Sequence, residues 1–356
     1  MHAFAIALLA VFQVLGPGGA VAAAQVSTGP PSRIDEALGR EGEILASMAD
    51  AAAAGRTATT DFTLTWTNDY FKAQPGTFVP FTVSFVAPEL SSPAALLYIR
   101  VTRAGRMSTT RRNGREAPAY ETIFPVRLTA RAGEPVTLTR GFAVPPGSYR
   151  VIVVLREAPE TPGTPMPNRK AGTLVVDIAV PDYWTADLAV STIMLADRLD
   201  ALKEPIPPDE LDEDPYVVGA HRIHRSQSAE FGRNRELVAV FLIYNPTVGA
   251  DAHFDVQVDY HVFRKDRQGK GSPPNPPGAP AAGSGERYVT RTNPQRFNPA
   301  LMGSRFDPAA GTPILAGQGI LLAGFEAGAY RLEITVTDLL SRKSLSRSVA
   351  FEVVDF

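Results

Sequence analysis

The chain of 356 residues carries 35 basic and 37 acidic side chains, which gives a formal net charge of −2. This balance provides no strong field for nucleic acid or for an anionic membrane surface, so we expect no nucleic-acid partner. The lack of cysteine excludes disulfides, thiolate chemistry and cysteine-ligated zinc. The high content of Gly (29) and Pro (31) favours many short strands joined by turns.

The N-terminus has the pattern of a secretory signal. An apolar run over residues 3–15 is followed by a Gly- and Pro-rich break and by small residues up to Ala24. The run is shorter than the roughly 20 residues of a membrane-spanning helix. We therefore predict a signal peptide over 1–24, export to the periplasm or the extracellular space, and no membrane span after cleavage. An uncleaved anchor and a buried helix are the alternatives.

An amphipathic helix is predicted over residues 30–55. Ser32 is a candidate N-cap, apolar residues then recur every three to four positions, and Gly55 ends the pattern. The helix can pack on the sandwich that follows, space it from the cleavage site, or mediate oligomerisation. Gly39 and Gly42 interrupt the apolar stripe, which favours packing or spacing.

A first β-sandwich is predicted over residues 57–182. The segment alternates between apolar and polar residues in about seven short stretches, separated by turns. This pattern indicates antiparallel strands of an immunoglobulin/fibronectin-like sandwich. Six arginines lie between Arg100 and Arg115. They favour a solvated hairpin, with binding of an anionic partner as the alternative.

A second sandwich is predicted over residues 186–356, with long loops at 203–233 and 268–286. It repeats the order of the first one, since a strand ending before Pro is again followed by a longer alternating strand. The motif G-x-Y-R also occurs twice, at 147–150 and at 328–331. The predicted fold class is therefore all-β, with two tandem antiparallel sandwiches preceded by a signal peptide and one short amphipathic helix.

The two repeated motifs predict a structural corner in each sandwich. In Greek-key sandwiches a Tyr near the start of a late strand can return its hydroxyl to the backbone at the corner. Tyr149 and Tyr330 have this position, and Gly147 and Gly328 permit the tight turn before them. A half-exposed Tyr that covers the end of the core is the alternative.

No catalytic motif is assembled in the sequence. G-x-S-x-G, a phosphate-binding loop and H-E-x-x-H are missing. His221 and His224 could contribute to a zinc site, and the acidic run 209–214 to a calcium site, but neither has the spacing of a known motif. Surface or strand-filling histidines and a solvated acidic loop are the alternatives. We predict no enzyme activity and no cofactor.

Part of the chain resembles a known family. The stretch G-S-Y-R-V-I-V-V-L at 147–155, the strand end V-P-D at 180–182 and the stretch L-A-V-S-T-I-M-L-A at 188–196 carry the resemblance. They look like the C-terminal sandwich region of exported von Willebrand factor A-related proteins of acidobacterial type, over about residues 135–200. The metal-binding A domain with its D-x-S-x-S motif is missing from this chain. The resemblance therefore implies an exported accessory sandwich and transfers no functional residues.

Two functions fit these features. The first is a non-catalytic exported protein whose sandwiches bind another protein or act as structural spacers in the cell envelope. The alternative is a carbohydrate-binding module that uses exposed aromatic side chains. The partner is accordingly expected to be a protein or a glycan at the envelope. The aromatic candidates for binding are Tyr183, Trp184, Tyr216 and Tyr288.

Overall fold

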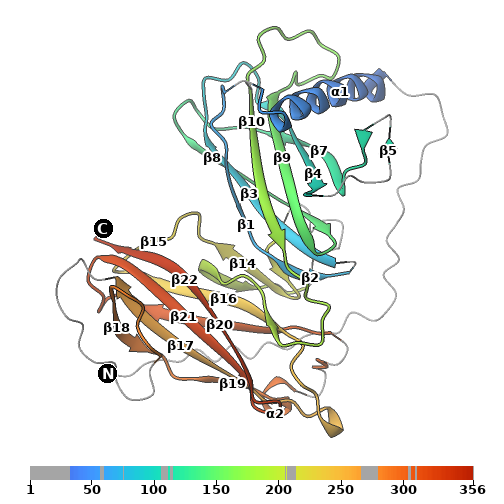
Figure 1. The fold of residues 1–356 in the computed structure, drawn as a ribbon. Coiled ribbons are helices and arrows are strands. Elements are labelled where there is room, and N and C mark those ends of the chain that lie inside the picture. Colours follow the sequence, from blue (N-terminus) through green and yellow to red (C-terminus); the bar gives the residue numbers. More distant parts are fainter. Residues whose placement is uncertain are drawn as a thin grey trace. The chain divides into compact units, whose positions relative to one another are not determined.

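Antiparallel sheets make up most of the computed structural model (Figure 1). The predicted signal peptide 1–24 and most of the acidic run 209–214 lie outside the described residues. Contacts divide the chain into two compact units with the main boundary between Asp182 and Tyr183, here called the N-terminal unit and the C-terminal unit. The structure describes residues 33–56, 60–74, 76–105, 111–112, 115–204, 206, 214–265, 280–303, 306–308 and 311–355.

The N-terminal unit contains two antiparallel sheets and one helix, α1 (Arg33–Ala53). In the first sheet, β3 pairs with β1 and β2 on one side and with β8 on the other. The second sheet has the order β10-β9-β4-β7, and β5 and β6 form a separate short hairpin. The strands are β1 (Thr65–Asn68), β2 (Phe71–Ala73), β3 (Gly76–Val86), β4 (Ala94–Arg103), β5 (Arg111–Arg112), β6 (Arg115–Glu116), β7 (Tyr120–Arg127), β8 (Pro135–Val144), β9 (Gly147–Glu157) and β10 (Ala171–Val180).

The core of this unit lies between its two sheets. Successive side chains of a strand point to opposite faces, so every second side chain along each strand points into the core. Phe81 and Val83 of β3 meet Ile99 of β4 and Val153 of β9 in one buried cluster. The alternation seen in the sequence therefore corresponds to two sheets packed face to face.

The C-terminal unit also contains two sheets. In one, β16 pairs with β11 and β12 on one side and with β20 on the other, and β14 and β13 extend the sheet beyond β12. The other has the order β15-β22-β21-β17-β18, with β19 also paired to β17. The strands are β11 (Ala189–Val190), β12 (Met194–Ala201), β13 (Val217–Val218), β14 (His221–Arg225), β15 (Glu230–Gly232), β16 (Glu236–Tyr244), β17 (Val256–Lys265), β18 (Glu286–Arg291), β19 (Gln295–Phe297), β20 (Ile314–Leu321), β21 (Gly328–Asp338) and β22 (Lys343–Val354).

The two units share the pairing of their main strands. In the N-terminal unit β3 pairs with β8, and β4 pairs with β7 and β9; in the C-terminal unit β16 pairs with β20, and β17 with β18 and β21. The last strand of each unit, β10 or β22, completes the second sheet. The prediction of an all-β fold built from antiparallel sandwiches is confirmed.

One sequence prediction about the C-terminal unit is wrong. The segment 203–233 was expected to be one long loop, yet its described part contains β13, β14 and β15. These strands have two to five residues each, too few to show a period in the sequence. β14 and β15 form on the edges of the longer strands β12 and β22, and β13 in turn pairs with β14. A 3₁₀ turn, η2 (Ala250–Ala252), and a short helix, α2 (Pro299–Met302), lie in the connections.

Candidate functional site

Helix α1 packs on the outer face of the second sheet of the N-terminal unit. Leu45 and Ala49 are fully buried there against Tyr98 of β4 and Ile152 of β9. The sequence of β9 explains this contact, because its residues from Val151 to Leu155 are all apolar. A strand that is apolar at every position is typical of burial on both faces. The helix therefore covers a sheet face that would otherwise expose apolar side chains.

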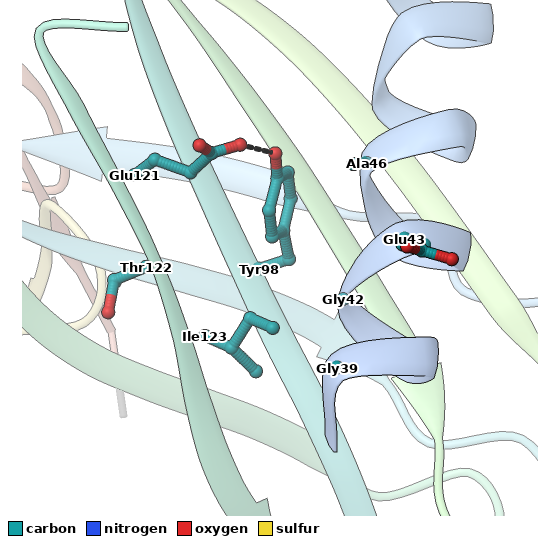
Figure 2. A pocket seen from close by; sticks show the side chains of 8 residues that line it. All are labelled: Gly39, Gly42, Glu43, Ala46, Tyr98, Glu121, Thr122 and Ile123. Carbon is teal, nitrogen blue, oxygen red and sulfur yellow. Dashed lines mark hydrogen bonds between the residues drawn. The ribbon is translucent and has the colours of Figure 1, made fainter. Parts of the chain in front are cut away.

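A cavity of about 720 Å³ lies beside the helix. Figure 2 shows α1 on one side of it and strands β4 and β7 on the other. Gly42 faces β7 across the cavity, since a Cβ atom there would lie in ordinary contact distance, 3.5 Å, from Cδ1 of Ile123. The cavity is lined by Gly39, Gly42, Glu43 and Ala46 of α1, Tyr98 of β4, and Glu121, Thr122 and Ile123 of β7.

A buried arginine connects the polar groups at this cavity. The Tyr98 hydroxyl donates to Glu121, and the two side chains point toward each other in Figure 2. Nε of Arg100 donates to the Tyr98 hydroxyl at 2.7 Å and to Glu121 at 3.2 Å. Nη1 of the same arginine donates to Oδ1 of Asp50 in α1 at 2.6 Å. Arg100 thus links the sheet to the helix.

Burial and these contacts shift the pKa values of two groups in the network. Burial, followed by the hydrogen bond to Glu121, raises the pKa of Tyr98 well above its usual range, so the phenol stays neutral. Burial opposes the charge of Arg100, but the hydrogen bond to Asp50 and the neighbouring Tyr98 and Glu121 raise its pKa overall. The phenol is therefore fixed as a hydrogen-bond donor and the guanidinium as a cation.

A second ionic contact fastens the first half of the helix. The Glu41 carboxylate accepts from Nη1 of Arg156 and from Nη1 of Arg169, each at 2.6 Å. All three side chains are largely buried. Buried charges need such pairing because the loss of hydration is otherwise costly. Together with Arg100, this cluster determines where α1 lies on the sheet.

Each unit has a tyrosine at the corner before a long strand: Tyr149 near the start of β9 in the N-terminal unit, and Tyr330 near the start of β21 in the C-terminal unit. The Tyr149 hydroxyl donates to the carbonyl oxygen of Pro145 at 2.7 Å, and the Tyr330 hydroxyl donates to that of Glu326 at 2.7 Å. Both tyrosines are 1% exposed. Gly147 has a φ angle of 149° and Gly328 one of 145°, which L-residues with a side chain rarely adopt.

An arginine covers each of these tyrosines. Arg103 lies opposite Tyr149 in the sheet register, and its guanidinium carbon is 5.8 Å from the ring centre. Arg264 lies opposite Tyr330 at 5.9 Å. Nη2 of Arg103 donates to the carbonyl oxygen of Pro146, and Nη2 of Arg264 to the equivalent carbonyl of the second corner, each at 2.9 Å.

Sequence reasoning missed both arginine roles. Arg100 and Arg103 were assigned to a solvated hairpin. This prediction is wrong for Arg100, which is 9% exposed, whereas Arg103 is exposed and packs on the corner tyrosine. The physical reason is that their partners lie far away in the sequence. The signal was a shared position, because Arg103 is the last residue of β4 and Arg264 the second-last residue of β17, and each lies opposite the tyrosine of a repeated motif.

The four aromatic candidates for binding do not form one surface. The prediction of exposure is wrong for Tyr183 (5% exposed) and Tyr216 (6%), because both are buried in the C-terminal unit. The ring of Tyr183 packs on that of Tyr244. Tyr288 is half-buried and packs on the rings of His261 and Phe263. Trp184 is 45% exposed.

The histidine pair does not converge on one site. His221 and His224 lie three residues apart in β14, so they point to opposite faces of the sheet. His221 is buried, and this burial lowers its pKa. Nε2 of His224 lies 2.7 Å from Oδ2 of Asp200. Within the described ranges, no three His, Asp or Glu side chains are grouped in a way that could hold a metal ion.

In the described part of the chain, no helix combines the length and the apolar character needed to cross a membrane.

The comparisons with known proteins are limited to distant structural likeness. No protein-family description and no curated protein matches the sequence. Among solved structures, a mutant of Salmonella alpha-2-macroglobulin has 13% identity and a TM-score of 0.21. The methylamine-reacted form of the Salmonella protein has 14% identity and the same TM-score. In each case the match covers 83% of this chain and 17% of the other, so the chain spans about a sixth of that protein's length.

Proposed function

We propose that the protein is an exported, non-catalytic interaction module of the cell envelope, built from two β-sandwich units. The observation that carries this proposal is the use of the polar groups at the cavity. Tyr98, Arg100 and Glu121 bind one another, and Arg100 also binds Asp50 of α1. These groups stabilise the docking of a helix, which is a structural task.

The electrostatics of the cavity support the same proposal. A general acid or base works best when its pKa lies near the operating pH. Burial raises the pKa of Tyr98 further above neutral pH and does not bring it closer. The Tyr98 hydroxyl already donates to Glu121 and accepts from Arg100. The polar groups at the cavity thus serve the packing of α1, and we place partner binding on the surfaces of the sandwiches.

Export is proposed from residues 1–24 and is tested by the N-terminus of the mature protein. The full-length chain is produced in a bacterial host with a Sec pathway, and the periplasmic fraction is analysed by mass spectrometry. The expected product begins at Gln25. Retention of the whole chain in the cytoplasm, with Met1 present, would contradict the proposal of export.

The choice of partner is tested by glycan binding and by crosslinking in envelope preparations of the source cells. A protein partner recovered by crosslinking, with no signal across a glycan array, supports the interaction module. The exposed Trp184 is the one observation that favours a carbohydrate-binding module instead, because an accessible indole ring can stack on a sugar. Glycan binding that Trp184→Ala abolishes would favour this second function. Leu321→Ala is the matched control, since Leu321 is also exposed in the C-terminal unit.

A further inference from the structure

The two units connect a pair of equivalent strands by segments of very different length. In the C-terminal unit, residues 339–342 connect β21 and β22 in a tight hairpin. In the N-terminal unit, the equivalent strands β9 and β10 are connected by residues 158–170, here called the β9–β10 loop. Figure 1 shows this loop extending beyond the ends of its two strands.

A buried carboxylate fastens the connection in both units. Glu157, the last residue of β9, is fully buried and accepts from the backbone N–H groups of Ser91 at 2.7 Å and Lys170 at 2.8 Å. Asp338, the last residue of β21, is also buried and accepts from the N–H of Thr247 and from N–H groups of its own hairpin. A short hairpin is therefore sufficient for this contact, and the additional residues of the β9–β10 loop are not needed for it.

The additional residues lie outside the core of the N-terminal unit. In the segment 160–168 every residue is exposed except Met166, which is half-buried. The base of the loop is fixed, because Nη1 of Arg169 donates to the Glu41 carboxylate of α1 at 2.6 Å. Exposed loops on a rigid scaffold commonly carry binding functions. The segment 160–168 is therefore a candidate contact surface.

The first part of this segment forms a defined turn. The N–H of Thr164 donates to the carbonyl oxygen of Thr161 at 3.2 Å. The two residues between them are Pro162 and Gly163, and Gly163 has a φ angle of 85°. Proline followed by glycine at the central positions, with a positive φ at the glycine, is typical of a type II turn. The turn directs the chain into residues 164–167.

Residues 164–167 have the sequence T-P-M-P, so each of them either is a proline or precedes one. Proline fixes its own φ angle at about −65°, and the residue before a proline is restricted to extended conformations. Both restrictions favour a polyproline II segment. Asn168 ends it with a φ angle of 52°, a left-handed conformation that asparagine tolerates. The exposed rings of Pro165 and Pro167 thus project from a backbone with little conformational freedom.

The chemistry of the loop argues against other modes of binding. Pro165 and Pro167 lack the N–H groups that one side of an added strand would need, so strand addition is disfavoured. The loop contains no aromatic side chain that could stack on a sugar or a base. Both of its cationic side chains are engaged, Arg169 with a carboxylate of α1 and Lys170 with a backbone carbonyl oxygen. Recognition of the exposed proline rings remains.

We propose that the β9–β10 loop is a partner contact, and that its polyproline II segment 164–167 docks in an aromatic-lined groove of another protein. This inference rests on the proposed function as an interaction module and names its contact. Aromatic-lined grooves bind such segments because a preformed polyproline II backbone loses little conformational entropy. Met166, between the two prolines, adds a flexible apolar side chain that can adapt to the groove.

The described part of a second copy of the chain does not offer such a groove. Among the described residues, Trp184 is the one aromatic side chain that is exposed. A single exposed ring cannot line both sides of a groove around a proline. The contact is therefore assigned to a different protein, and self-association is one of the outcomes of the test.

The test measures the capture of envelope proteins of the source cells on the immobilised full chain. A synthetic peptide of residues 160–168 serves as the competitor. In the double variant Pro165→Ala, Pro167→Ala, binding of the captured protein should weaken roughly tenfold or more, because the rings and the rigid backbone are both lost. The matched control is Pro135→Ala, since Pro135 is also exposed in the N-terminal unit. We expect unchanged binding in this control.

A second variant lacks residues 160–168, which makes its connection as short as the hairpin of the C-terminal unit. It should fold, because the clamp at Asp338 closes with a hairpin of that length, and it should lose the capture. The groove is tested by the intrinsic fluorescence of the captured protein. Because the peptide contains no aromatic residue, a change in tryptophan or tyrosine emission on its addition reports on the partner.

Four results would overturn the proposal. Capture that survives in both folded variants places the contact elsewhere and leaves the interaction module intact. A captured protein that the peptide does not displace, or displaces without a change in aromatic emission, does not use an aromatic groove for this segment. Recovery of a second copy of the chain alone assigns the loop to self-association. If the folded chain captures no envelope protein, the proposed function fails as well.

Discussion

The two units carry equivalent sheets whose outer faces are opposite in character. Because Arg103 and Arg264 each lie opposite a corner tyrosine, positions of one unit can be matched with those of the other. Leu96 of the N-terminal unit then corresponds to Gln257, and Ile152 corresponds to Glu333. Two further pairs follow the same register, namely Tyr98 with Asp259 and Val154 with Thr335.

This difference shows what determines whether a sheet face carries a helix. The inward positions of both sheets are apolar, and each unit closes its corner with the same tyrosine and arginine. The outward positions of the N-terminal unit are apolar where α1 packs. In the C-terminal unit most of them are polar, such as Thr335, which hydrogen-bonds to Ser346 in the next strand, and the buried Phe263 is covered by Tyr288 and Arg331. The outer face can therefore change while the sandwich is retained.

The largest effect is expected when Ile152, on the outer face of the N-terminal unit, is replaced by glutamate, the residue at the corresponding position 333 of the C-terminal unit. In Ile152→Glu, α1 should leave the sheet, because burial of an unpaired carboxylate is more costly than undocking. We expect the unfolding free energy of the N-terminal unit to fall by roughly 3 kcal/mol. Urea denaturation of the full chain measures this loss.

The control for this change is Thr335→Glu in the C-terminal unit. Its position is polar, and no helix in the described part of the C-terminal unit packs on it, so the variant should lose less than about 1 kcal/mol, mainly through repulsion from Asp259 in the neighbouring strand. Equal losses in the two variants would contradict the contrast between the faces.

The two corners should respond alike to loss of the tyrosine hydroxyl. Tyr149→Phe and Tyr330→Phe each remove a buried hydrogen bond and leave a carbonyl oxygen without its donor, which should cost about 1–2 kcal/mol in the respective unit. Urea unfolding of each variant measures the loss. Partner binding should stay intact in folded Tyr149→Phe. A corner that tolerates the change without loss would not have the proposed structural role.

A smaller effect is expected from Arg103→Lys and Arg264→Lys. Lysine lacks the planar fork that stacks on the tyrosine and donates to the backbone. We expect losses of about 0.5–1 kcal/mol, with the larger loss for Arg264, which also forms an ion pair with Glu326. Thermal unfolding of both variants gives the comparison, and a larger loss for Arg103→Lys would contradict it.

The smallest effect is a pH dependence of the C-terminal unit. The hydrogen bond from Arg331 lowers the pKa of Glu286 below its usual value of 4.5. A lowered pKa in the folded state stabilises the protein above the unfolded pKa, and this contribution is lost as the pH falls through the folded pKa. Glu286→Gln should therefore make unfolding less sensitive to pH between about 5 and 3, by less than about 1 kcal/mol. An unchanged pH profile would contradict the role of this pair.

The strand pattern and the two corners could be predicted because they depend on local sequence. The hydroxyl of Tyr149 reaches only four residues back, and alternation within a strand is visible in one short window. The contrast between the outer faces was also visible, since residues 151–155 are all apolar whereas β21 alternates.

The site itself could not be predicted from the sequence, because it depends on contacts between distant segments. Arg100 meets Asp50 of the helix and Glu121 of a neighbouring strand. Tyr183, in the connection before β11, packs on Tyr244 at the end of β16.

The central claim is that outward side chains decide whether the sandwich carries a helix, and amide hydrogen exchange of α1 in the full chain tests it most directly. Most of the stability of a helix in a protein comes from the packing of its amphipathic face, so an undocked α1 should exchange quickly. We predict that the amides around Leu45 and Ala49 are protected in the unmodified chain and in Thr335→Glu, and lose this protection in Ile152→Glu. Protection of α1 that persists in folded Ile152→Glu would contradict the claim.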